Sequence, residues 1–123
     1  VIPCKKLLFT NGTKDHGIMT VKKLNVKEKF PDNCVVGRDT LNGILKPDIN
    51  AFEEFIRLMK INSNDKIVFF EDSPENLVTA KSLGWITVLI GRRKPMINDI
   101  DFWFTDINQA LNYFNNCISK NKH

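Results

Sequence analysis

Five short runs of apolar residues recur along the chain, and each is continuous instead of alternating with polar residues. They cover residues 6–9, 34–36, 66–70, 86–90 and 102–104. Continuous apolar runs of this length are typical of β-strands that are buried on both faces. The pattern therefore predicts five strands in a sheet that is covered on both sides.

Between these runs, apolar residues recur at the three- and four-residue spacing of amphipathic helices. The predicted helical faces carry Ile49, Phe52, Phe55, Ile56 and Met59, then Leu77, Ala80 and Leu83, then Ile107, Ala110, Leu111, Phe114 and Ile118. Gly84 is a typical stop after the second of these helices. A weaker helix is predicted over residues 14–24, with Ile18, Val21 and Leu24 inward. Strands that alternate with helices of this length predict an α/β fold with a parallel sheet.

The length of 123 residues and the hydrophobic content of 42% suit one domain with its own core. We expect that domain to cover residues 1–118, with a frayed tail at residues 119–123. No apolar run approaches the roughly 20 residues of a membrane span, and the N-terminus lacks the order of a signal peptide. Cys4, Cys34 and Cys117 show no metal-binding spacing, so we expect reduced thiols in a cytoplasmic or nuclear protein.

The formal charge of +4 is a mild indication of anionic partners. Basic residues interleave with acidic ones along the chain, and the only tight basic cluster is Gly91-Arg92-Arg93-Lys94. That cluster is interpreted as a solvated loop. The composition therefore does not favour a nucleic-acid-binding protein.

A polar turn follows the first apolar run. Thr10, Asn11, Gly12 and Thr13 come directly after Phe9, so a strand leads into hydroxyl, amide and glycine. Ligands of open α/β sheets bind at the carboxyl ends of the strands. Thr10 and nearby backbone N–H groups suit an oxyanion, which Gly12 would let approach closely. The same residue types also build an ordinary capped turn, and this segment alone leaves both interpretations open.

A lysine and a proline precede the helix expected around residues 49–59. Pro47 suits the first position of that helix, and the residue before a proline is held extended, which places Lys46 at the helix start. A cation is unfavourable at the positive end of a helix dipole, and a bound anion would offset that cost. The alternative is a lysine whose ammonium extends into solvent.

Two adjacent carboxylates, Glu71 and Asp72, follow the third apolar run, and Ser73 and Pro74 suit the start of the next helix. Like charges repel at close range. A Mg²⁺ ion held by one or two carboxylates and a substrate phosphate would remove this conflict. The alternative is a pair of solvated acids at a helix N-terminus, where the dipole stabilises them.

In this order the three motifs resemble motifs II, III and IV of the haloacid dehalogenase (HAD) superfamily. Residues 9–91 are most similar to the pyrimidine 5′-nucleotidase branch of the eukaryotic HAD phosphatases. That branch shows Phe-Thr-Asn, Lys-Pro-x-x-x-Ala-Phe and Asp-Asp-Ser-x-x-Asn. Residues 100–114 are similar to the last strand and helix of these enzymes. The one departure is Glu71, where the branch usually has aspartate, although other HAD phosphotransferases carry Glu-Asp there.

The resemblance implies a three-layer Rossmann-like core and a Mg²⁺-dependent phosphatase that hydrolyses phosphomonoesters, with nucleoside monophosphates as the expected substrates. Thr10 would hydrogen-bond the transferring phosphoryl group, and Asn11 and Gly12 would line the same phosphate site. Lys46 would neutralise the phosphoryl oxygens. Thr10 and Lys46 are therefore the implied catalytic residues in this chain.

The resemblance also implies a metal site. Asp72 would bind Mg²⁺ directly, and Glu71 would act as a ligand or through a water molecule. We expect these carboxylates to converge with Thr10 and Lys46 in one small polar cleft at the carboxyl ends of the strands. His16 is interpreted as an exposed polar residue, with contact to the substrate as the alternative.

The nucleophile of the HAD superfamily has no counterpart in the sequence. It is the first aspartate of an Asp-x-Asp motif at the end of the first strand and forms an aspartyl-phosphate, but residues 1–9 contain no aspartate. Asp99 and Asp101 have the right spacing, yet the apolar run 102–104 follows them instead of preceding them, so we reject this pair.

The sheet order 3-2-1-4-5 of the superfamily makes the missing first strand central, and the cap that follows it is absent as well. We therefore expect this chain to be the C-terminal part of a longer protein, inactive as a fragment. An upstream segment of the same protein, or a neighbour through strand swapping, would fill the gap between residues 7–9 and 67–70.

Two other classes of function compete with the phosphatase. A non-catalytic Rossmann-like module, or pseudoenzyme, would keep the phosphate site and lack the nucleophile. A receiver-type signalling domain is disfavoured, because its acidic pair precedes its lysine, and here Lys46 precedes the acids.

Overall fold

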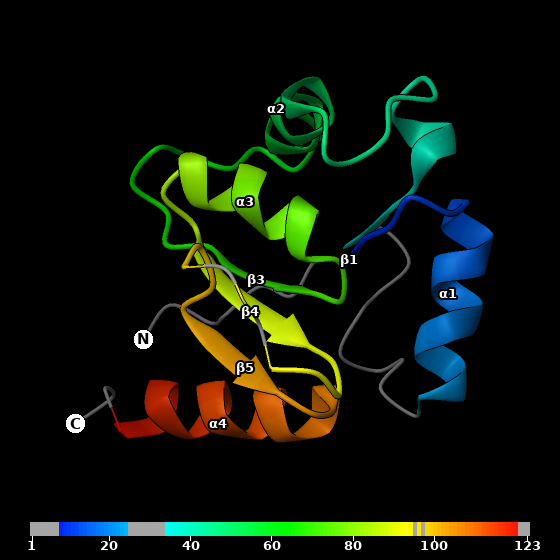
Figure 1. The fold of residues 1–123 in the computed structure, drawn as a ribbon. Helices are drawn as coiled ribbons and strands as arrows, with labels where there is room; N and C mark the ends of the chain where they lie inside the picture. The colour runs from blue at the N-terminus through cyan, green and yellow to red at the C-terminus, as the bar shows by residue number, and fades with distance from the viewer. Residues whose placement is uncertain (1–7, 25–33, 95, 97, 121–123) are drawn as a thin grey trace. The chain divides into compact units, whose positions relative to one another are not determined.

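The computed structural model describes residues 8–24, 34–94, 96 and 98–120. In this part of the chain the elements are β1 (Leu8–Phe9), α1 (Lys14–Lys23), β2 (Val35–Val36), the short 3₁₀ helix η3 (Arg38–Thr40), α2 (Ile49–Leu58), β3 (Val68–Glu71), α3 (Pro74–Ser82), β4 (Ile86–Ile90), β5 (Phe102–Phe104) and α4 (Ile107–Lys120). Strands and helices alternate, as the hydrophobic pattern predicts, and every strand pair is parallel (Figure 1). The α/β class is therefore confirmed.

The chain divides into two compact units, residues 2–63 and residues 64–123, here called the N-terminal unit and the C-terminal unit. The first contains a sheet with the order β1-β2, and the second a sheet with the order β3-β4-β5. Within the described residues, β1 and β3 thus belong to different sheets and do not pair directly. A strand from elsewhere between them stays a prediction.

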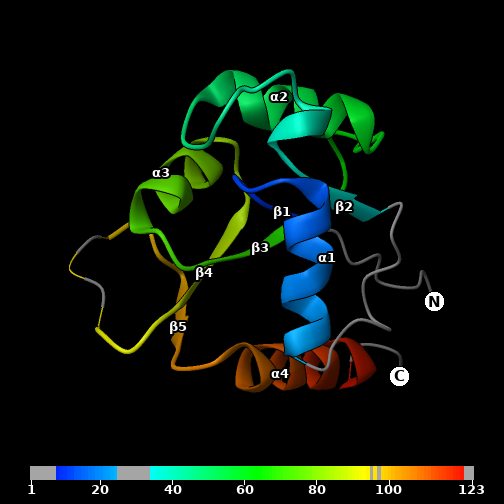
Figure 2. The ribbon, with the colours of Figure 1, turned by 90° about the vertical axis from the view of Figure 1, so that its right-hand side faces the viewer.

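The N-terminal unit places a helix on each face of its two strands. On one face the ring of Phe9 stacks on Phe55 from α2, with 4.6 Å between centroids, and meets the edge of Phe52 at 5.3 Å. On the other face α1 packs closely, because an added Cβ on Gly17 would lie 3.1 Å from Val35 (Figure 2). This arrangement leaves the carboxyl end of β1 between the two helices of its own unit.

The C-terminal unit has β4 at its centre. The consecutive residues Thr87, Val88 and Leu89 are all buried. Because successive side chains of a strand point to opposite faces of the sheet, β4 is buried on both faces, as the continuous apolar run predicts. Helices α3 and α4 cover opposite faces (Figure 1). From α4, Phe114 contacts Phe70 of β3 at 5.5 Å. On β5, Trp103 is 37% exposed, contrary to the expected burial on both faces, because β5 is the outer strand of this sheet.

Helix boundaries differ from the prediction at a few positions. Leu24 is 45% exposed instead of inward, because α1 ends at Lys23 and Leu24 only caps it. Helix α4 continues through Lys120, two residues into the segment expected as a tail. Some of the predictions fall on parts of the chain that the structure does not describe. These parts are residues 6, 7 and 121–123, Cys4, and the side chains of Cys117 and Ile118.

Two helices end in the same hydrogen-bonded motif with different residues at its left-handed position. After α3, Gly84 has a φ of +82°, and the N–H of Trp85 donates to the carbonyl of Ala80 at 3.1 Å. After α2, Lys60 has a φ of +54°, and the N–H of Ile61 donates to the carbonyl of Ile56 at 3.0 Å. Gly84 is the predicted stop, whereas Lys60 holds a conformation that costs a side-chain-bearing residue free energy.

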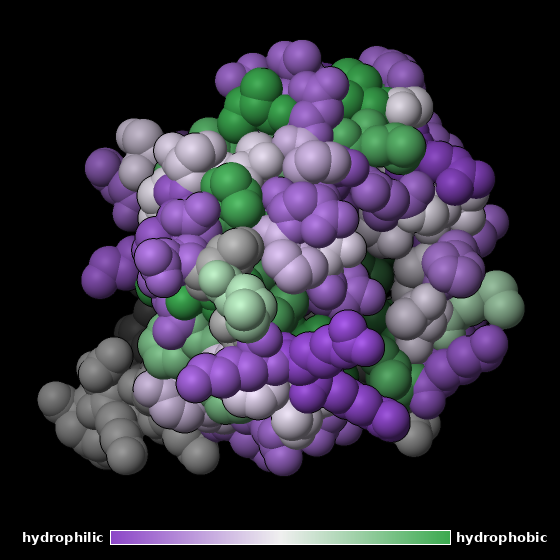
Figure 3. All heavy atoms as spheres, in the orientation of Figure 1, coloured by the Kyte–Doolittle hydropathy of each residue, from purple (hydrophilic) through white to green (hydrophobic). Residues whose placement is uncertain are grey.

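Some large apolar side chains are exposed, among them Met19, Val78 and Met96. In the view of Figure 3, hydrophobic atoms form small separate areas among hydrophilic ones. Isolated exposed apolar residues are normal for a folded domain. Among the described helices, none has the length and apolar character that a transmembrane span requires.

Replacing Lys60 with glycine should raise the free energy of unfolding by about 0.5–1 kcal/mol, because glycine adopts the left-handed conformation without steric cost. Urea unfolding monitored by circular dichroism measures this change. The matched control is Lys22→Gly on the exposed side of α1, where the backbone is helical. That variant should lose about 1 kcal/mol. Changes of the same sign in both variants would contradict the role assigned to Lys60.

Candidate phosphate site and carboxylate pair

The turn after β1 is organised by the hydroxyl of Thr10. Its oxygen accepts a hydrogen bond from the N–H of Gly12 at 3.0 Å, and its backbone N–H donates to the carbonyl of Val36 at 2.9 Å. Thr13, not Thr10, is the N-cap of α1, and it accepts from the N–H of His16 at 3.2 Å. The N–H of Gly12 is therefore used within the turn. The hydroxyl hydrogen of Thr10 has no acceptor among the described residues.

Asn11 joins this turn to the segment that precedes α2. Its side-chain amide donates to the carbonyl of Lys46 at 3.1 Å, and its amide oxygen accepts from the backbone N–H of Lys46 at 2.8 Å. The side-chain amide of Asn11 thus bonds both the N–H and the C=O of Lys46, as the backbone of a neighbouring β-strand would do. This pair connects two positions that are 35 residues apart in the sequence.

Lys46 is 7% exposed, so the interpretation as a solvated lysine is wrong. Its ammonium donates to the carbonyl of Phe9 at 2.6 Å and lies 4.7 Å from the centroid of the Phe9 ring. The carbonyl and the ring face both stabilise the buried cation. The structure therefore fixes a positive charge at the carboxyl end of β1, on the carbonyl of the residue that precedes Thr10.

The helix after Lys46 begins later than expected. Asp48 is the N-cap of α2, and its carboxylate accepts from the N–H of Asn50 at 2.9 Å. Pro47 therefore precedes the cap instead of occupying the first helical position, and Ile49 at that position is 38% exposed. The Lys46–Pro47 peptide bond is cis, and the N–H of Asp48 closes a turn onto the carbonyl of Leu45 at 3.0 Å.

The segment after β2 forms a second wall beside the Thr10 turn. An added Cβ on Gly37 would lie 2.5 Å from the backbone nitrogen of Lys14, closer than real contacts allow. The next residue, Arg38, donates from its backbone N–H to the carbonyl of Gly12 at 2.9 Å. The imidazole of His16 lies over Gly12, with Cδ2 3.0 Å from the position that a Cβ would occupy. Sequence reasoning missed Gly37 and Arg38, because their contacts depend on the pairing of β1 with β2.

The two adjacent carboxylates of the C-terminal unit have different surroundings. Glu71 is 8% exposed, and its Oε2 accepts from the N–H groups of Asp72 and Ser73, each at 3.0 Å. Asp72 is exposed. Ser73 is the N-cap of α3 by position, but its side chain makes no capping bond, and Glu71 binds the backbone there instead. Pro74 is the first helical residue, as predicted.

These carboxylates suit Mg²⁺ in the chemistry of their oxygen atoms. Asp72 presents an exposed carboxylate at the carboxyl end of β3, where a hard cation with one or two protein ligands would bind. One oxygen of Glu71 is already engaged by backbone N–H groups. Within the described residues no group of three or more His, Cys, Asp or Glu side chains gathers as a ligand set. Asp72 is therefore the better candidate ligand, with Glu71 shaping the turn that carries it.

The expected convergence of the phosphate residues with the carboxylates involves both units. Thr10 and Lys46 belong to the N-terminal unit, and Glu71 and Asp72 to the C-terminal unit. Each half of the expected cleft lies at the carboxyl end of a strand in its own sheet. Their meeting in one cleft stays a prediction.

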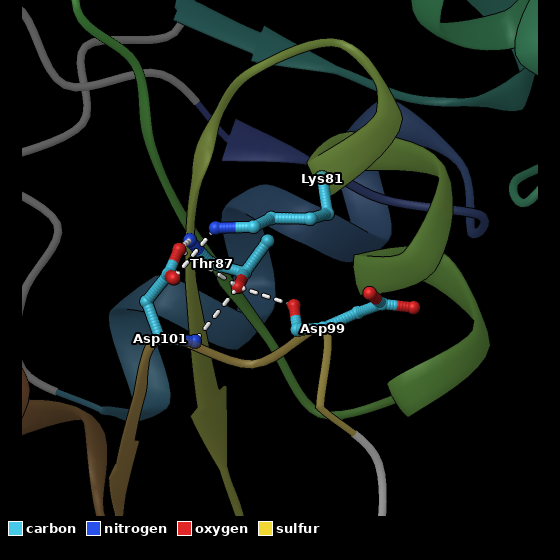
Figure 4. A network of polar contacts seen from close by, with 4 residues as sticks. All are labelled: Lys81, Thr87, Asp99 and Asp101. Carbon is cyan, nitrogen blue, oxygen red and sulfur yellow. Dashed lines mark hydrogen bonds and ion pairs between the residues drawn. The ribbon is translucent and has the colours of Figure 1, made fainter.

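The rejected aspartate pair has a structural role in the C-terminal unit (Figure 4). The carboxylate of Asp101 accepts from the backbone N–H of Thr87 at 2.9 Å and from Lys81 Nζ at 2.6 Å. The buried hydroxyl of Thr87 donates to the backbone carbonyl of Asp99 at 2.7 Å. The carboxylate of Asp99 points away from this network (Figure 4). Asp101 therefore attaches the start of β5 to β4.

Burial alone would raise the pKa of Asp101, but the hydrogen bond and charge of Lys81 and the N–H of Thr87 outweigh it and lower that pKa. A carboxylate with a lowered folded pKa stabilises the fold above its unfolded pKa, and this contribution is lost as the pH falls. The ion pair and hydrogen bonds of Asp101 therefore stabilise the fold at neutral pH.

No protein-family model matches the chain. The fold is similar to that of a HAD phosphatase from Thermococcus onnurineus, whose crystal structure aligns with a TM-score of 0.58 at 22% sequence identity. The alignment covers 78% of this chain and 44% of that protein, so this chain spans less than half the length of its structural neighbour. At this identity the similarity shows the fold alone. The chain has the Rossmann-like α/β fold of a HAD phosphatase core, as the sequence predicts.

Replacing Asp101 with asparagine should lower the free energy of unfolding by about 1–2 kcal/mol at pH 7, because a charge-assisted hydrogen bond is lost. The difference from the unchanged chain should shrink as the pH falls below the ordinary aspartate value of 3.8, where the carboxylate of the unchanged chain becomes protonated. Thermal unfolding between pH 3 and pH 7 measures both effects. Asp99→Asn, which alters only an outward side chain, is the control, and an equal loss there would refute the assignment.

Replacing Gly37 with alanine should cost about 1–3 kcal/mol of folding free energy, because the new methyl group meets backbone atoms that cannot rotate away. Gly91→Ala is the matched control, since a Cβ there has no atom within 4 Å. Chemical denaturation of both variants checks the expectation. A Gly37 variant as stable as the Gly91 variant would show that the Thr10 turn and the segment after β2 pack less closely than described.

Proposed function

We propose that this chain supplies the phosphate-binding and metal-binding parts of a Mg²⁺-dependent HAD-type phosphatase that hydrolyses phosphomonoesters. Nucleoside monophosphates are the proposed substrates. The observation that carries the proposal is the burial of the Lys46 ammonium at the carboxyl end of β1, where it donates to the carbonyl of Phe9 at 2.6 Å. A positive charge fixed beside a hydroxyl and a glycine is suited to a phosphoryl group.

Each residue of the phosphate site has a distinct task in this proposal. The Thr10 hydroxyl uses its oxygen to hold the turn and keeps its hydrogen for a phosphoryl oxygen. Asn11 fixes the backbone of Lys46 through two hydrogen bonds, so the ammonium does not have to be positioned when the substrate arrives. Lys46 then neutralises charge on the transferring group. This is catalysis by positioning and by electrostatic stabilisation.

Asp72 would hold Mg²⁺, and Glu71 would keep the Asp72 turn in place through its bonds to the backbone N–H groups. Bound Mg²⁺ would supply charge neutralisation for the phosphate. The nucleophilic aspartate, which would form the aspartyl-phosphate, is proposed to come from a segment outside these 123 residues.

Titration of the chain with inorganic phosphate, followed by the backbone amide signals of Gly12 and Lys46, tests the phosphate site. Weak binding is expected, and Lys46→Met should weaken it by about tenfold or more, because a charge-assisted contact is removed. Thr10→Val, which removes only the hydroxyl, should weaken it less. Lys22→Met on the exposed face of α1 is the control for net charge. No binding by the unchanged chain, or equal binding by the Lys46 and Lys22 variants, would refute the proposed site.

A turnover assay with nucleoside monophosphates and Mg²⁺ tests the location of the nucleophile. The 123-residue chain should bind phosphate without hydrolysing the substrates. Robust hydrolysis would show that a residue of this chain is the nucleophile.

The second candidate is a non-catalytic phosphate-binding module, favoured by the lack of any aspartate in residues 1–9. Reading the gene upstream of Val1 separates the two. An apolar strand that ends in Asp-x-Asp supports the enzyme, and its absence supports the module.

A further inference from the structure

Arg38 lies beside the proposed phosphate site without being part of any motif that the sequence indicated. Its backbone N–H donates to the carbonyl of Gly12 at 2.9 Å, and its Nη1 lies 3.5 Å from the carbonyl oxygen of Asn11. Both partners belong to the turn that follows β1. Arg38 is therefore held against the same turn that carries the Thr10 hydroxyl.

The position of Arg38 is set by rigid neighbours. Gly37 approaches the turn so closely that a Cβ would lie 2.5–2.7 Å from backbone atoms of Gly12, Thr13 and Lys14. The hydroxyl of Thr40 accepts from the N–H of Gly37 at 3.0 Å and donates to its carbonyl at 2.7 Å. The backbone of Arg38 is thus fixed on both sides, and only its side chain is free to adjust.

No acidic side chain neutralises Arg38 within the described residues. The adjacent carboxylate, Asp39, is occupied at the start of α1, where it accepts from the N–H of Lys14 at 2.9 Å. Among the residues that the structure describes, the guanidinium of Arg38 makes one hydrogen bond, the long contact to Asn11. A guanidinium has five N–H donors, so most of them remain available to a ligand.

Lys46 and Arg38 approach the turn at different depths. The Lys46 ammonium is buried and donates to the carbonyl of Phe9, whereas Arg38 is exposed and contacts the carbonyl of Asn11. These two carbonyls are two residues apart, so the chain between them spans at most about 7 Å. Thr10 lies between them. A small anion at the Thr10 hydroxyl would therefore have one cation on its buried side and a second on its exposed side.

We propose that Arg38 is a second phosphate-binding residue, which contacts from the solvent side the same phosphoryl group that Lys46 contacts from the buried side. This inference rests on the proposed function. A phosphomonoester at neutral pH carries close to two negative charges, which these two cations match. The planar fork of a guanidinium fits two phosphate oxygens at once, so the role depends on arginine more than on positive charge alone.

Inorganic phosphate titrations followed by the amide signal of Gly12 test this role in the full chain. Arg38→Met should weaken phosphate binding about five- to tenfold, and Arg38→Lys should restore only part of the loss. Arg57→Met, which removes one exposed arginine from α2 in the same unit, should leave binding within about twofold and controls for net charge. Urea unfolding should show the Arg38 variants to be as stable as the unchanged chain, because the side-chain hydrogen bond that they lose among the described residues is long.

The outcomes separate this inference from the proposed function. If Lys46→Met weakens binding and Arg38→Met behaves like Arg57→Met, the role of Arg38 is refuted and the phosphate site stands. If the unchanged chain binds no phosphate, both proposals fail. If Arg38→Lys binds phosphate as tightly as the unchanged chain, the bidentate contact is refuted.

Discussion

The N-terminal unit depends on the burial of one cation. An ammonium removed from water is costly unless polar groups replace its hydration. Lys46 obtains the carbonyl of Phe9 and the face of the Phe9 ring, and Asn11 fixes its backbone with two further bonds. Phe9 also stacks on α2, so the residue that stabilises the cation is itself part of the core. Packing and charge are therefore coupled at the carboxyl end of β1.

In the C-terminal unit, backbone groups also hold charged side chains, but here the side chains are carboxylates and the backbone groups are N–H donors. Glu71 places its carboxylate on two backbone N–H groups at the end of β3, and Asp101 places its own on the N–H of Thr87 in β4. Both acids thus satisfy the backbone of the turn or strand beside them. Asp72 differs, because its side chain is exposed at the same strand end as Glu71.

Sequence reasoning predicted the elements well wherever hydrophobic burial alone decides them. The bounds of β4 and β5 match the apolar runs, and in β4 the side chains of Thr87, Val88 and Leu89 are buried. It also selected Lys46 as a candidate, but not the way in which Lys46 is held. Asn11 and Lys46 are 35 residues apart, and no local pattern encodes a contact that exists only after β1 and α2 have packed. Arg38 was missed for the same reason. Its proximity to the turn follows from the pairing of β1 with β2.

The paired amide of Asn11 has a consequence for the chemical durability of the chain. Asn11 is followed by Gly12, and an asparagine before glycine readily loses ammonia when the next backbone nitrogen attacks its side-chain carbonyl, because glycine lacks a Cβ to hinder the approach. In the folded chain both reacting groups are restrained. The amide is bound to the backbone of Lys46, and the N–H of Gly12 is bound to the hydroxyl of Thr10. The hydrogen bonds that orient the lysine therefore also slow deamidation. We expect Asn11 to deamidate mainly in molecules that have transiently unfolded.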